Sequence, residues 1–406
     1  MKHVIIIVLT VLVFSCKEKI NKNTLKNGIY RAELKVNDTL NLPFNFEVVS
    51  EHKIKIRNAE EVIEVNDITY KGDSVYIQTP VFEGFIVAKI KDSVLIGSFK
   101  KPELNRIMAF KAEKNDSRFD ASDDFPKYDI SGNWETIFSP NSKENAYIAK
   151  GVFKQYDNKV TGTFRTTTGD YRFLEGVLNG NKLKLSTFDG AHAFLFTAEV
   201  NDSVINGMFY SGNHWKEPFV AKRNENFELP DADSLTYLKE GYDKVQFSFP
   251  DENGNMVSLN DKQFKNKVVL VQIMGTWCPN CLDESQFYAN YYKTNSNEDL
   301  EIVALAFEYV NTKAKAFNNI KRLKENIGIN YPVLLAQYGS SSKVKAQEKL
   351  PMLNHVLSYP TTIYIDKKGK VRKIHTGFNG PATGEKYIEF KLNFDNFINE
   401  LLEEQL

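Results

Sequence analysis

Two cysteines, Cys278 and Cys281, stand three positions apart in the stretch VVLVQIMGTWCPNCLDESQFY, residues 268–288. A pair with this spacing can bind a metal, attach a haem, form a structural bridge or exchange electrons with other disulfides. A tetrahedral zinc site needs four ligands, and the sequence has no second cysteine pair or nearby His-x-x-His. Covalent haem attachment needs Cys-x-x-Cys-His, but residue 282 is Leu. An inert bridge stays open, although closing so short a loop removes little chain entropy. Thiol–disulfide exchange is therefore favoured.

The sequence around the pair places Cys278 at the start of a helix. Val268–Met274 is a continuous apolar run, typical of a strand buried on both faces, and residues 282–288 can form a helix. Pro279 suits the first helical position, where its missing N–H has no cost. Unpaired N–H groups at a helix N-terminus favour thiolate over thiol. We therefore predict that Cys278 attacks a partner disulfide and that Cys281, one turn later, resolves the mixed disulfide.

The third cysteine, Cys16, follows a basic start and the apolar run Val4–Phe14. That run is too short to span a bilayer, which needs about 20 apolar residues, and it is typical of a secretory signal. The sequence before Cys16 resembles a bacterial lipoprotein cleavage box. It predicts a signal peptide over residues 1–15, lipid attachment at Cys16 and a tether over residues 16–24; a plain cleaved signal with an incidental cysteine is the alternative. A lipid anchor would hold the chain on a membrane, facing away from the cytoplasm.

Composition limits the function classes. The chain is 42% hydrophobic and 13% aromatic, which is sufficient for packed cores, and its length of 406 residues predicts two or three domains. Its 52 basic residues balance 52 acidic residues, so no overall field would attract nucleic acid. We expect no nucleic-acid partner.

The chain before residue 226 has the pattern of antiparallel β structure. Short alternating runs, cut by Gly, Asn and Asp turns, predict β-rich modules over residues 25–115 and 128–225, with a polar linker at 113–127. KDSVLIGSF, residues 91–99, aligns with NDSVINGMF, residues 201–209. We predict a duplicated barrel or sandwich, although two sheets of one merged domain would give the same pattern.

After a second linker, at 223–245, the period of the sequence changes. Buried apolar runs alternate with helical patterns, and a hairpin turn lies at 366–370. This order predicts one α/β domain over residues 246–406.

Residues 246–406 resemble the thioredoxin superfamily, and specifically the TlpA/ResA-like disulfide oxidoreductases of bacterial envelopes. The matching stretches are FSFPD from residue 247, NKVVLVQIMGTWCPNC from 266, SYPTTIYIDKKGKV from 358 and TGFNGPATG from 376. The β-rich modules resemble extensions on lipoprotein members from Bacteroidetes-type bacteria, which implies no activity for them. The resemblance predicts a thioredoxin fold at the C-terminus.

The resemblance also implies roles for single residues. Cys278 would be the exposed attacking thiol and Cys281 the buried resolving thiol of a redox disulfide, Cys278–Cys281, with Trp277 as the flanking aromatic. Pro360 would follow a cis peptide bond, face the disulfide and leave neighbouring backbone free to pair with a substrate strand. A trans proline at a strand start is the alternative.

Glu284 matches a position where the family often has a glutamate near the active site. A buried Glu284 would have a raised pKa and could relay the proton of Cys281, whereas an exposed one would only favour the first turn of the helix. Gln272 stands where thioredoxin has a buried aspartate, and because Gln cannot titrate, that proton route is absent.

Three further residues, His192, His214 and Trp215, are close in sequence to Asp189 and Tyr210 in the second β module. They could line a ligand pocket or be ordinary turn and sheet residues.

These observations predict a thiol–disulfide oxidoreductase that reduces protein disulfides without a metal or other cofactor. Its partners would be disulfide-containing envelope proteins and a dithiol electron donor. A lipid anchor would place it in the cell envelope, on the periplasm-facing outer membrane or, alternatively, on the cell surface. The competing hypothesis is a binding lipoprotein whose β modules capture a ligand or protein, with the thioredoxin domain as a redox-sensing or docking part. A peroxidase is disfavoured because no Thr-x-x-Cys pattern is present.

Overall fold

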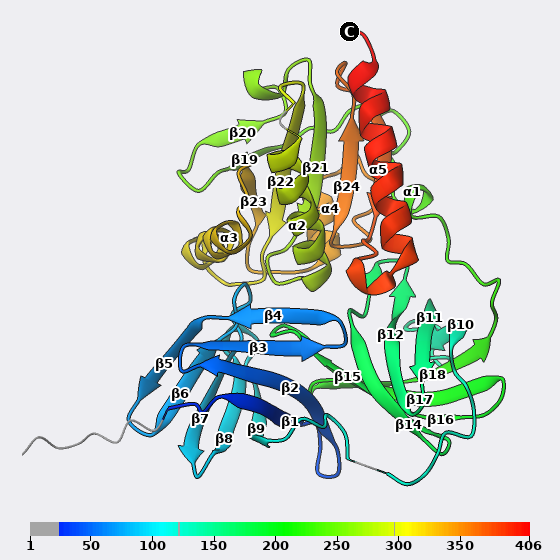
Figure 1. Ribbon diagram of the computed structural model, residues 1–406. Helices are drawn as coiled ribbons and strands as arrows, with labels where there is room; N and C mark the ends of the chain where they lie inside the picture. Colours follow the sequence, from blue (N-terminus) through cyan, green and yellow to red (C-terminus); the bar gives the residue numbers. More distant parts are fainter. Residues whose placement is uncertain (1–23, 121, 296) are drawn as a thin grey trace, which may run out of the picture.

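The computed structural model describes residues 24–120, 122–295 and 297–406. The predicted signal peptide, the lipid-attachment residue Cys16 and the tether up to residue 23 lie outside these ranges. Two β units lie side by side, and an α/β unit is stacked on both (Figure 1). Within the described ranges, no helix combines the length and apolar character required to cross a bilayer.

The first β unit is a meander of nine strands that almost closes into a barrel. Each strand is antiparallel to its neighbours in the sheet, and β1 pairs with both β2 and β9, so the edges of the sheet are β4 and β5. Side chains alternate between core and solvent, as strands with one buried face require. The strands are β1 Gly28–Lys35, β2 Asn41–Ser50, β3 Lys53–Asn58, β4 Glu61–Val65, β5 Asp67–Lys71, β6 Ser74–Gln78, β7 Phe85–Lys91, β8 Val94–Lys101 and β9 Arg106–Lys114.

The second β unit is a closed barrel. Its strands, apart from the two-residue β13, pair in chain order from β10 to β18, and β18 pairs back onto β10. Closure leaves these strands without a free edge. The strands are β10 Gly132–Phe138, β11 Tyr147–Tyr156, β12 Lys159–Thr166, β13 Gly169–Asp170, β14 Leu174–Asn179, β15 Lys182–Phe188, β16 Ala193–Val200, β17 Val204–Ser211 and β18 Trp215–Arg223.

Aromatic side chains fill the core of this barrel. Trp134 and Phe138 are fully buried, and the Phe138 ring lies 5.3 Å from that of Phe164 and 5.5 Å from that of Phe219. Side chains therefore fill the interior of the barrel, and a ligand could contact only its outer surface or its mouth.

The two β units have similar strand connectivity. In each, the first strand pairs with the second and the last, and the aligned residues Gly97 and Gly207 lie in the strand before the last. An added Cβ at either glycine would collide with a neighbouring strand: with the Val87 carbonyl for Gly97, and with the Phe219 ring for Gly207. The antiparallel barrel-like architecture agrees with the sequence expectation, and the shared path agrees with a repeated unit.

The segment joining the two units is anchored between them. Arg118 is buried, and its guanidinium donates to the carbonyl oxygens of Arg57 (3.0 Å) and Ser186 (3.0 Å) and to Asn58 Oδ1 (3.2 Å). Phe188 of β15 stacks on Phe44 of β2, at 4.3 Å between ring centroids. The polar stretch predicted as a linker therefore contributes to the interface between the units.

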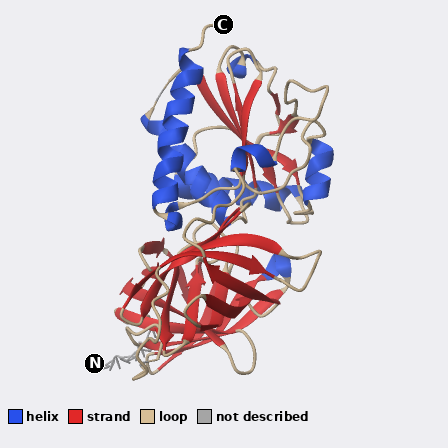
Figure 2. Ribbon diagram, turned by 90° about the vertical axis from the view of Figure 1, so that its right-hand side faces the viewer, coloured by secondary structure: helices blue, strands red, loops and turns tan. Residues whose placement is uncertain are grey.

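The α/β unit has a five-stranded sheet in the order β23-β22-β21-β24-β25, with helices on both faces (Figure 2). β21 is parallel to β22 and antiparallel to β24. Short helix α1 and the bridge between Leu238 and Leu353 attach the predicted second linker to this unit. The elements are α1 Ala232–Leu235, β19 Ser248–Pro250, β20 Met256–Ser258, β21 Val268–Met274, α2 Pro279–Thr294, β22 Leu300–Phe307, α3 Lys313–Ile327, β23 Val333–Gln337, α4 Lys343–Lys349, β24 Thr361–Ile365, β25 Val371–Thr376 and α5 Glu385–Glu403.

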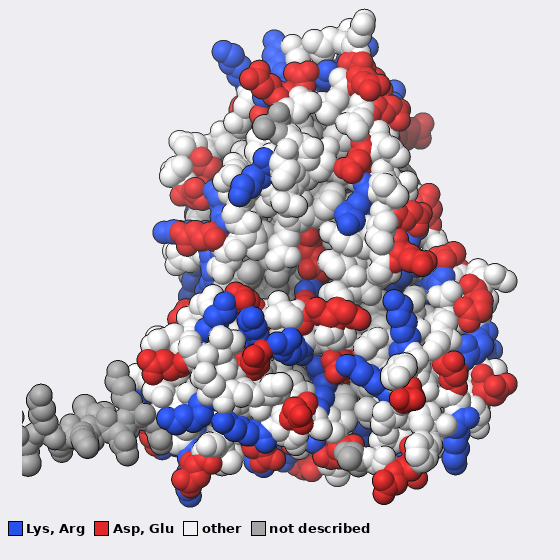
Figure 3. All heavy atoms as spheres, in the orientation of Figure 1, with Lys and Arg blue, Asp and Glu red and all other residues white. Residues whose placement is uncertain are grey.

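Basic and acidic side chains are interspersed over the face of the molecule shown in Figure 3. This mixture agrees with the equal numbers of the two charge types in the sequence.

Candidate active site

Cys278 is the N-cap residue of α2, and Pro279 occupies the first turn, as predicted. The Cys278 Sγ accepts a hydrogen bond from the Cys281 N–H (3.2 Å) and donates one to the Tyr359 carbonyl oxygen (3.3 Å). Both cysteines are free thiols in the structure, and Cys281 is fully buried. Cys278 is the more accessible of the two, but the expectation of an exposed thiol is wrong: only 7% of its surface is exposed, and Tyr359 lies against it.

The loop opposite the cysteines contains a cis peptide bond between Tyr359 and Pro360. The Pro360 carbonyl accepts a hydrogen bond from the Gly377 N–H (2.9 Å), which ties the loop to the end of β25. Trp277 lies beside it, with its ring 5.7 Å from that of Tyr359 and its Nε1 donating to the Phe307 carbonyl (2.9 Å). The structure therefore brings Trp277, Cys278 and Pro360 together, as the resemblance implied.

Glu284 is fully buried, so its alternative as an exposed helix carboxylate is wrong. Gln272 Nε2 donates to its Oε2 (2.8 Å), and Thr362 Oγ1 and the Tyr288 hydroxyl donate to its Oε1 (3.0 and 3.3 Å). Burial raises the pKa of Glu284 to about 7, although these hydrogen bonds oppose the rise. Gln272 thus holds the carboxyl of Glu284 in place.

The resolving thiol lies in the same buried region. Burial, followed by the hydrogen bond and the charge of Cys278, raises the pKa of Cys281 well above its ordinary value, and Glu284 adds to the rise. Cys281 therefore retains its proton at neutral pH, and Glu284 is a nearby group that titrates there.

Glu308, directly after β22, is a functional candidate that the sequence reasoning missed. The Thr276 N–H and Oγ1 donate to its two carboxylate oxygens (both 2.8 Å), which fixes the turn that leads to Trp277. Burial raises the pKa of Glu308 to about 7. The available signal was an acid at the end of an apolar strand, because the carboxyl ends of parallel strands meet at one edge of a sheet.

Arg172, in the second barrel, was also missed. Its guanidinium pairs with Asp283 of α2, with Glu61 of β4 (2.5 Å) and more distantly with Asp189 (3.7 Å), and it donates to the Pro279 carbonyl (3.2 Å). Burial raises the pKa of Asp283 to about 7 although Arg172 opposes the rise. One buried cation thus joins both β units to the helix that carries the cysteines.

A turn of the second barrel packs directly against the active site. The Ser358 hydroxyl donates to the Thr168 carbonyl (2.8 Å), and the Asn280 side chain donates to the Asp170 carbonyl (3.3 Å). An added Cβ on Gly169 would approach the Asn280 side-chain amide to 2.5 Å. The turn therefore covers one side of the start of α2.

A cleft of about 1060 Å³ lies between the second barrel, this turn included, and residues that flank the cysteine pair. Trp277, Asn280, Lys343 and Tyr359 line it from the α/β unit. Its barrel wall includes the predicted pocket residues His192, His214 and Trp215, together with Tyr147, Tyr171, Phe194 and Phe209. The side chain of Lys343 is close enough to Cys278 for their charges to interact.

The two remaining residues of that predicted group are not among those lining the cleft. Asp189 is buried behind it and pairs with the His192 ring (3.2 Å), and Tyr210 packs against the core of the first β unit. Among residues 24–120, 122–295 and 297–406, no three His, Cys, Asp or Glu side chains converge as metal ligands would.

The fold and this cysteine pair define a thioredoxin-fold thiol–disulfide oxidoreductase. A sequence family described as Redoxin matches residues 239–388. The chain is 33% identical over 140 residues to the thiol-disulfide oxidoreductase ResA of Bacillus subtilis, covering 34% of this chain and 69% of that protein. It is 27% identical over 158 residues to the thioredoxin-like protein YneN of the same organism, covering 39% and 81%. A solved thiol-disulfide oxidoreductase from Bacteroides fragilis is 20% identical, with a TM-score of 0.27 over 37% of this chain and 99% of that one.

The chain belongs to the TlpA/ResA-like thiol-disulfide oxidoreductases of the thioredoxin superfamily. The Redoxin match begins at residue 239, so the two β units lie outside it.

Proposed function

We propose that this protein reduces disulfide bonds of proteins in the cell envelope through the dithiol Cys278–Cys281. The observation that carries the proposal is the position of Cys278 at the start of α2, with Cys281 buried one turn behind it and the loop of Pro360 in front. Reduction is the direction implied by the resemblance to TlpA/ResA-like proteins.

In the proposed reaction the Cys278 thiolate attacks one sulfur of the substrate disulfide. The substrate S–S bond breaks, one substrate cysteine leaves as a thiolate, and the other stays bound to Cys278 as a mixed disulfide. Cys281 then loses its proton and attacks the Cys278 sulfur, which releases the second substrate thiolate. Two electrons have moved to the substrate, and a Cys278–Cys281 disulfide remains for an external dithiol donor to reduce.

Glu284 is the proposed acceptor of the proton of Cys281. A base is needed because Cys281 has a raised pKa, and a carboxylate with a pKa of about 7 combines sufficient basicity with ionisation at neutral pH. Trp277 and the backbone beside Pro360 are the proposed contacts for the substrate chain around its disulfide.

The proposed location is the cell envelope, with attachment through a lipid on Cys16. The support is the signal-like sequence before Cys16, together with the lipoprotein resemblance. Radiolabelled palmitate should be incorporated by the wild-type chain expressed in a lipoprotein-processing bacterium, and not by Cys16→Ser.

The mechanism predicts that Cys281→Ser traps substrates. Without the resolving thiol, the mixed disulfide on Cys278 persists and should be visible as bands of higher mass on non-reducing gels of envelope extracts. Cys278→Ser is the matched control, because it keeps Cys281 but lacks the attacking thiol and should trap nothing. The wild-type chain should also reduce insulin, and Cys278→Ser should lose at least about 100-fold of that rate. Equal insulin reduction by the two proteins would exclude the proposed reaction.

A ligand-binding role for the β units has one specific point of support, the cleft at the mouth of the second barrel. The barrel core itself is packed with aromatic side chains. A ligand would therefore lie next to the cysteine pair, which makes binding part of the redox reaction and not a separate function.

A further inference from the structure

The cleft in front of the cysteine pair holds cations that lack acidic partners. Arg106, at the start of β9, and Lys343, at the start of α4, line it and form no ion pair with any residue that the structure describes. Lys101 lies in an adjoining hollow and donates to a backbone carbonyl (3.1 Å). Exclusion of water, followed by the charges of Arg106 and Lys101, lowers the pKa of His214 to about 4. Arg106 and Lys101 are therefore both close to His214, and positive charge gathers at this end of the cleft.

Two acidic residues also line the cleft, but neither forms an ion pair with Arg106 or Lys343. Asp170 is buried, and its carboxylate accepts hydrogen bonds from the backbone N–H groups of Gly380 (2.7 Å) and Arg172 (2.7 Å). Glu144 is exposed on the loop before β11. A negatively charged ligand would supply the missing partners.

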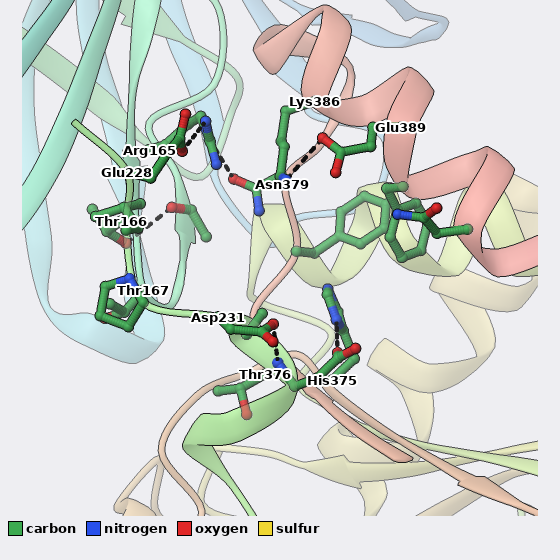
Figure 4. A pocket seen from close by; sticks show the side chains of 18 of the residues that line it. Arg165, Thr166, Thr167, Glu228, Asp231, His375, Thr376, Asn379, Lys386 and Glu389 are labelled. Atoms are coloured by element: carbon green, nitrogen blue, oxygen red, sulfur yellow. Dashed lines mark hydrogen bonds and ion pairs between the residues drawn. The ribbon is translucent and has the colours of Figure 1, made fainter. Parts of the chain in front are cut away.

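A second cavity shows the opposite arrangement. It has a volume of about 430 Å³ and lies between β12 and the far end of α5 from the C-terminus (Figure 4). There Arg165 pairs with Glu228 (3.6 Å), Lys386 with Glu389 (2.8 Å), and the His375 ring with a carboxylate of α1 (2.6 Å). Three of its cationic side chains are thus paired within the protein, and a fourth, Lys373, lies over the Tyr364 ring (4.7 Å).

Aromatic side chains form much of the cleft wall. Trp215 is 51% exposed, and Tyr147, Tyr171 and Trp277 are half-buried around it. The buried hydroxyl of Tyr359 has no hydrogen-bond partner among the described residues. Large aromatic surfaces left in water favour an apolar or aromatic ligand, and tyrosine and tryptophan are typical of protein-binding surfaces.

The shape of the cleft favours an extended chain. A neighbouring hollow of about 270 Å³ shares Arg106, His192, Ser211, His214 and Trp277 with the cleft, so the two form one continuous depression on either side of Trp277. Their size exceeds the roughly 300–1,000 Å³ of ordinary small-molecule pockets. A polypeptide segment can occupy such a depression with its cysteine beside Trp277 and Tyr359, the neighbours of Cys278.

We propose that this cleft binds the substrate polypeptide around its disulfide and selects segments in which the cysteine is flanked by aromatic and acidic residues. The proposal rests on the proposed reduction of protein disulfides and adds the class of substrate. Aromatic side chains would pack on Trp215 and Trp277, and carboxylates would pair with Arg106 and Lys343.

The test uses the full-length protein and three synthetic peptides, each joined through its cysteine to the same thiol fluorophore: Asp-Phe-Cys-Tyr-Asp, Lys-Phe-Cys-Tyr-Lys and Asp-Ala-Cys-Ala-Asp. Bis(2-hydroxyethyl) disulfide serves as a small substrate without flanking residues. We expect kcat/KM for the acidic aromatic peptide to exceed that for the basic peptide by about 10-fold, since partly exposed charge pairs are only modestly favourable. The kcat/KM for the acidic aromatic peptide should also exceed the value for the acidic alanine peptide by at least about 3-fold.

Arg106→Glu should bring the acidic-to-basic ratio to about one or below, and Trp215→Ala should bring the aromatic-to-alanine ratio to about one. Lys222→Glu is the matched control for charge. It also replaces a basic residue by Glu, at an exposed position of β18 that is seven residues, or about 23 Å along a strand, from Trp215. This variant should keep the wild-type acidic-to-basic ratio of kcat/KM. Ratios within one variant do not depend on how much of the protein is folded.

Equal kcat/KM for all three peptides in the wild-type protein, with the small disulfide reduced, would overturn the substrate class and leave the reductase function standing. Wild-type ratios retained in both Arg106→Glu and Trp215→Ala would overturn the cleft as the binding site. If the wild-type protein reduces neither the peptides nor the small disulfide, the proposed function fails and this inference fails with it.

Discussion

At the scale of single residues, Gln272 and Glu284 have separate roles, one as a hydrogen-bond donor and the other as a titrating group. The glutamine side chain does not titrate, but its amide can donate two hydrogen bonds. It donates them to the Glu284 carboxylate (2.8 Å) and the Ser285 hydroxyl (3.1 Å). The titrating group of this site is thus on the helix, and the strand residue holds it.

Glu284→Gln should slow the resolution of the mixed disulfide by about 100-fold at pH 8, the lower range for loss of a general base. Since burial raises the pKa of Glu284 to about 7, the wild-type rate should increase as pH rises through 7, and the variant should lack this limb. Insulin reduction measured from pH 5.5 to 9 tests both points. Asp283→Asn is the control: it removes a buried acid with the same raised pKa that pairs with Arg172, and it should retain the limb. An unchanged pH profile in Glu284→Gln would rule out the proton relay.

The same raised pKa affects stability. A carboxyl whose pKa is raised by folding stabilises the protein below its ordinary pKa of 4.5, and this contribution is lost as pH rises through about 7. The free energy of unfolding of the wild-type protein should therefore fall across this range, and Glu284→Gln should show a smaller fall in urea titrations. A larger fall in the variant would contradict the assignment.

At the scale of elements, the sequence predicted what depends on local pattern. The strand β21, the turn and the start of α2 were predictable because an apolar run, a proline and a helical stretch act within some 20 neighbouring residues. The cis bond before Pro360 was implied by the family resemblance. The covering turn of the second barrel could not be predicted, because its contact between Thr168 and Ser358 joins residues 190 positions apart. The contact between Arg172 and Asp283 could not be predicted either, because no local sequence pattern relates the two residues.

The close approach of this turn predicts the effect of a methyl group on Gly377. Its φ of 79° lies in the left-handed region, and an added Cβ would be 2.8 Å from the carbonyl carbon of Thr168. Gly377→Ala should lower the free energy of unfolding by about 1–2 kcal/mol for the backbone conformation and by about 1–3 kcal/mol more for the overlap. Gly254→Ala is the control, since Gly254 has a φ of 86° with no atom within 4 Å of the added Cβ, so only the first cost applies. In urea titrations Gly377→Ala should lose more free energy of unfolding than Gly254→Ala. Equal losses in the two variants would show that the turn does not constrain Gly377.

At the scale of the whole molecule, the second barrel packs against the residues around the cysteine pair. It covers one side of α2, forms one wall of the cleft and supplies Arg172, whose partners lie in all three units. A ligand in this cleft would therefore contact both the barrel and the residues beside Cys278.

Arg172→Leu should lower the free energy of unfolding by about 3–5 kcal/mol, because Asp283, Glu61 and Asp189 would lose the cation that offsets their burial. Arg57→Leu is the matched control: Arg57 pairs with Glu47 on the surface, and its loss should change stability by no more than about 1 kcal/mol. Urea titrations of both variants test the difference. Similar small losses in the two would mean that the buried network does not hold the units together.

The position of Arg172 also has a consequence for how the chain is made. Residues 172 and 283 are synthesised more than a hundred residues apart, so a barrel that folds as it emerges must hold a buried cation without its helical partner until α2 follows. Domains generally fold in the order of their synthesis, so until α2 follows this cation has, of Asp283, Glu61 and Asp189, only Glu61 and the more distant Asp189 as carboxylate partners. We expect the second barrel to be less stable, and cleaved faster by proteases, in a chain that ends at residue 245 than in the full-length chain. Completion of the cysteine-bearing helix would then also complete the fold of the second barrel.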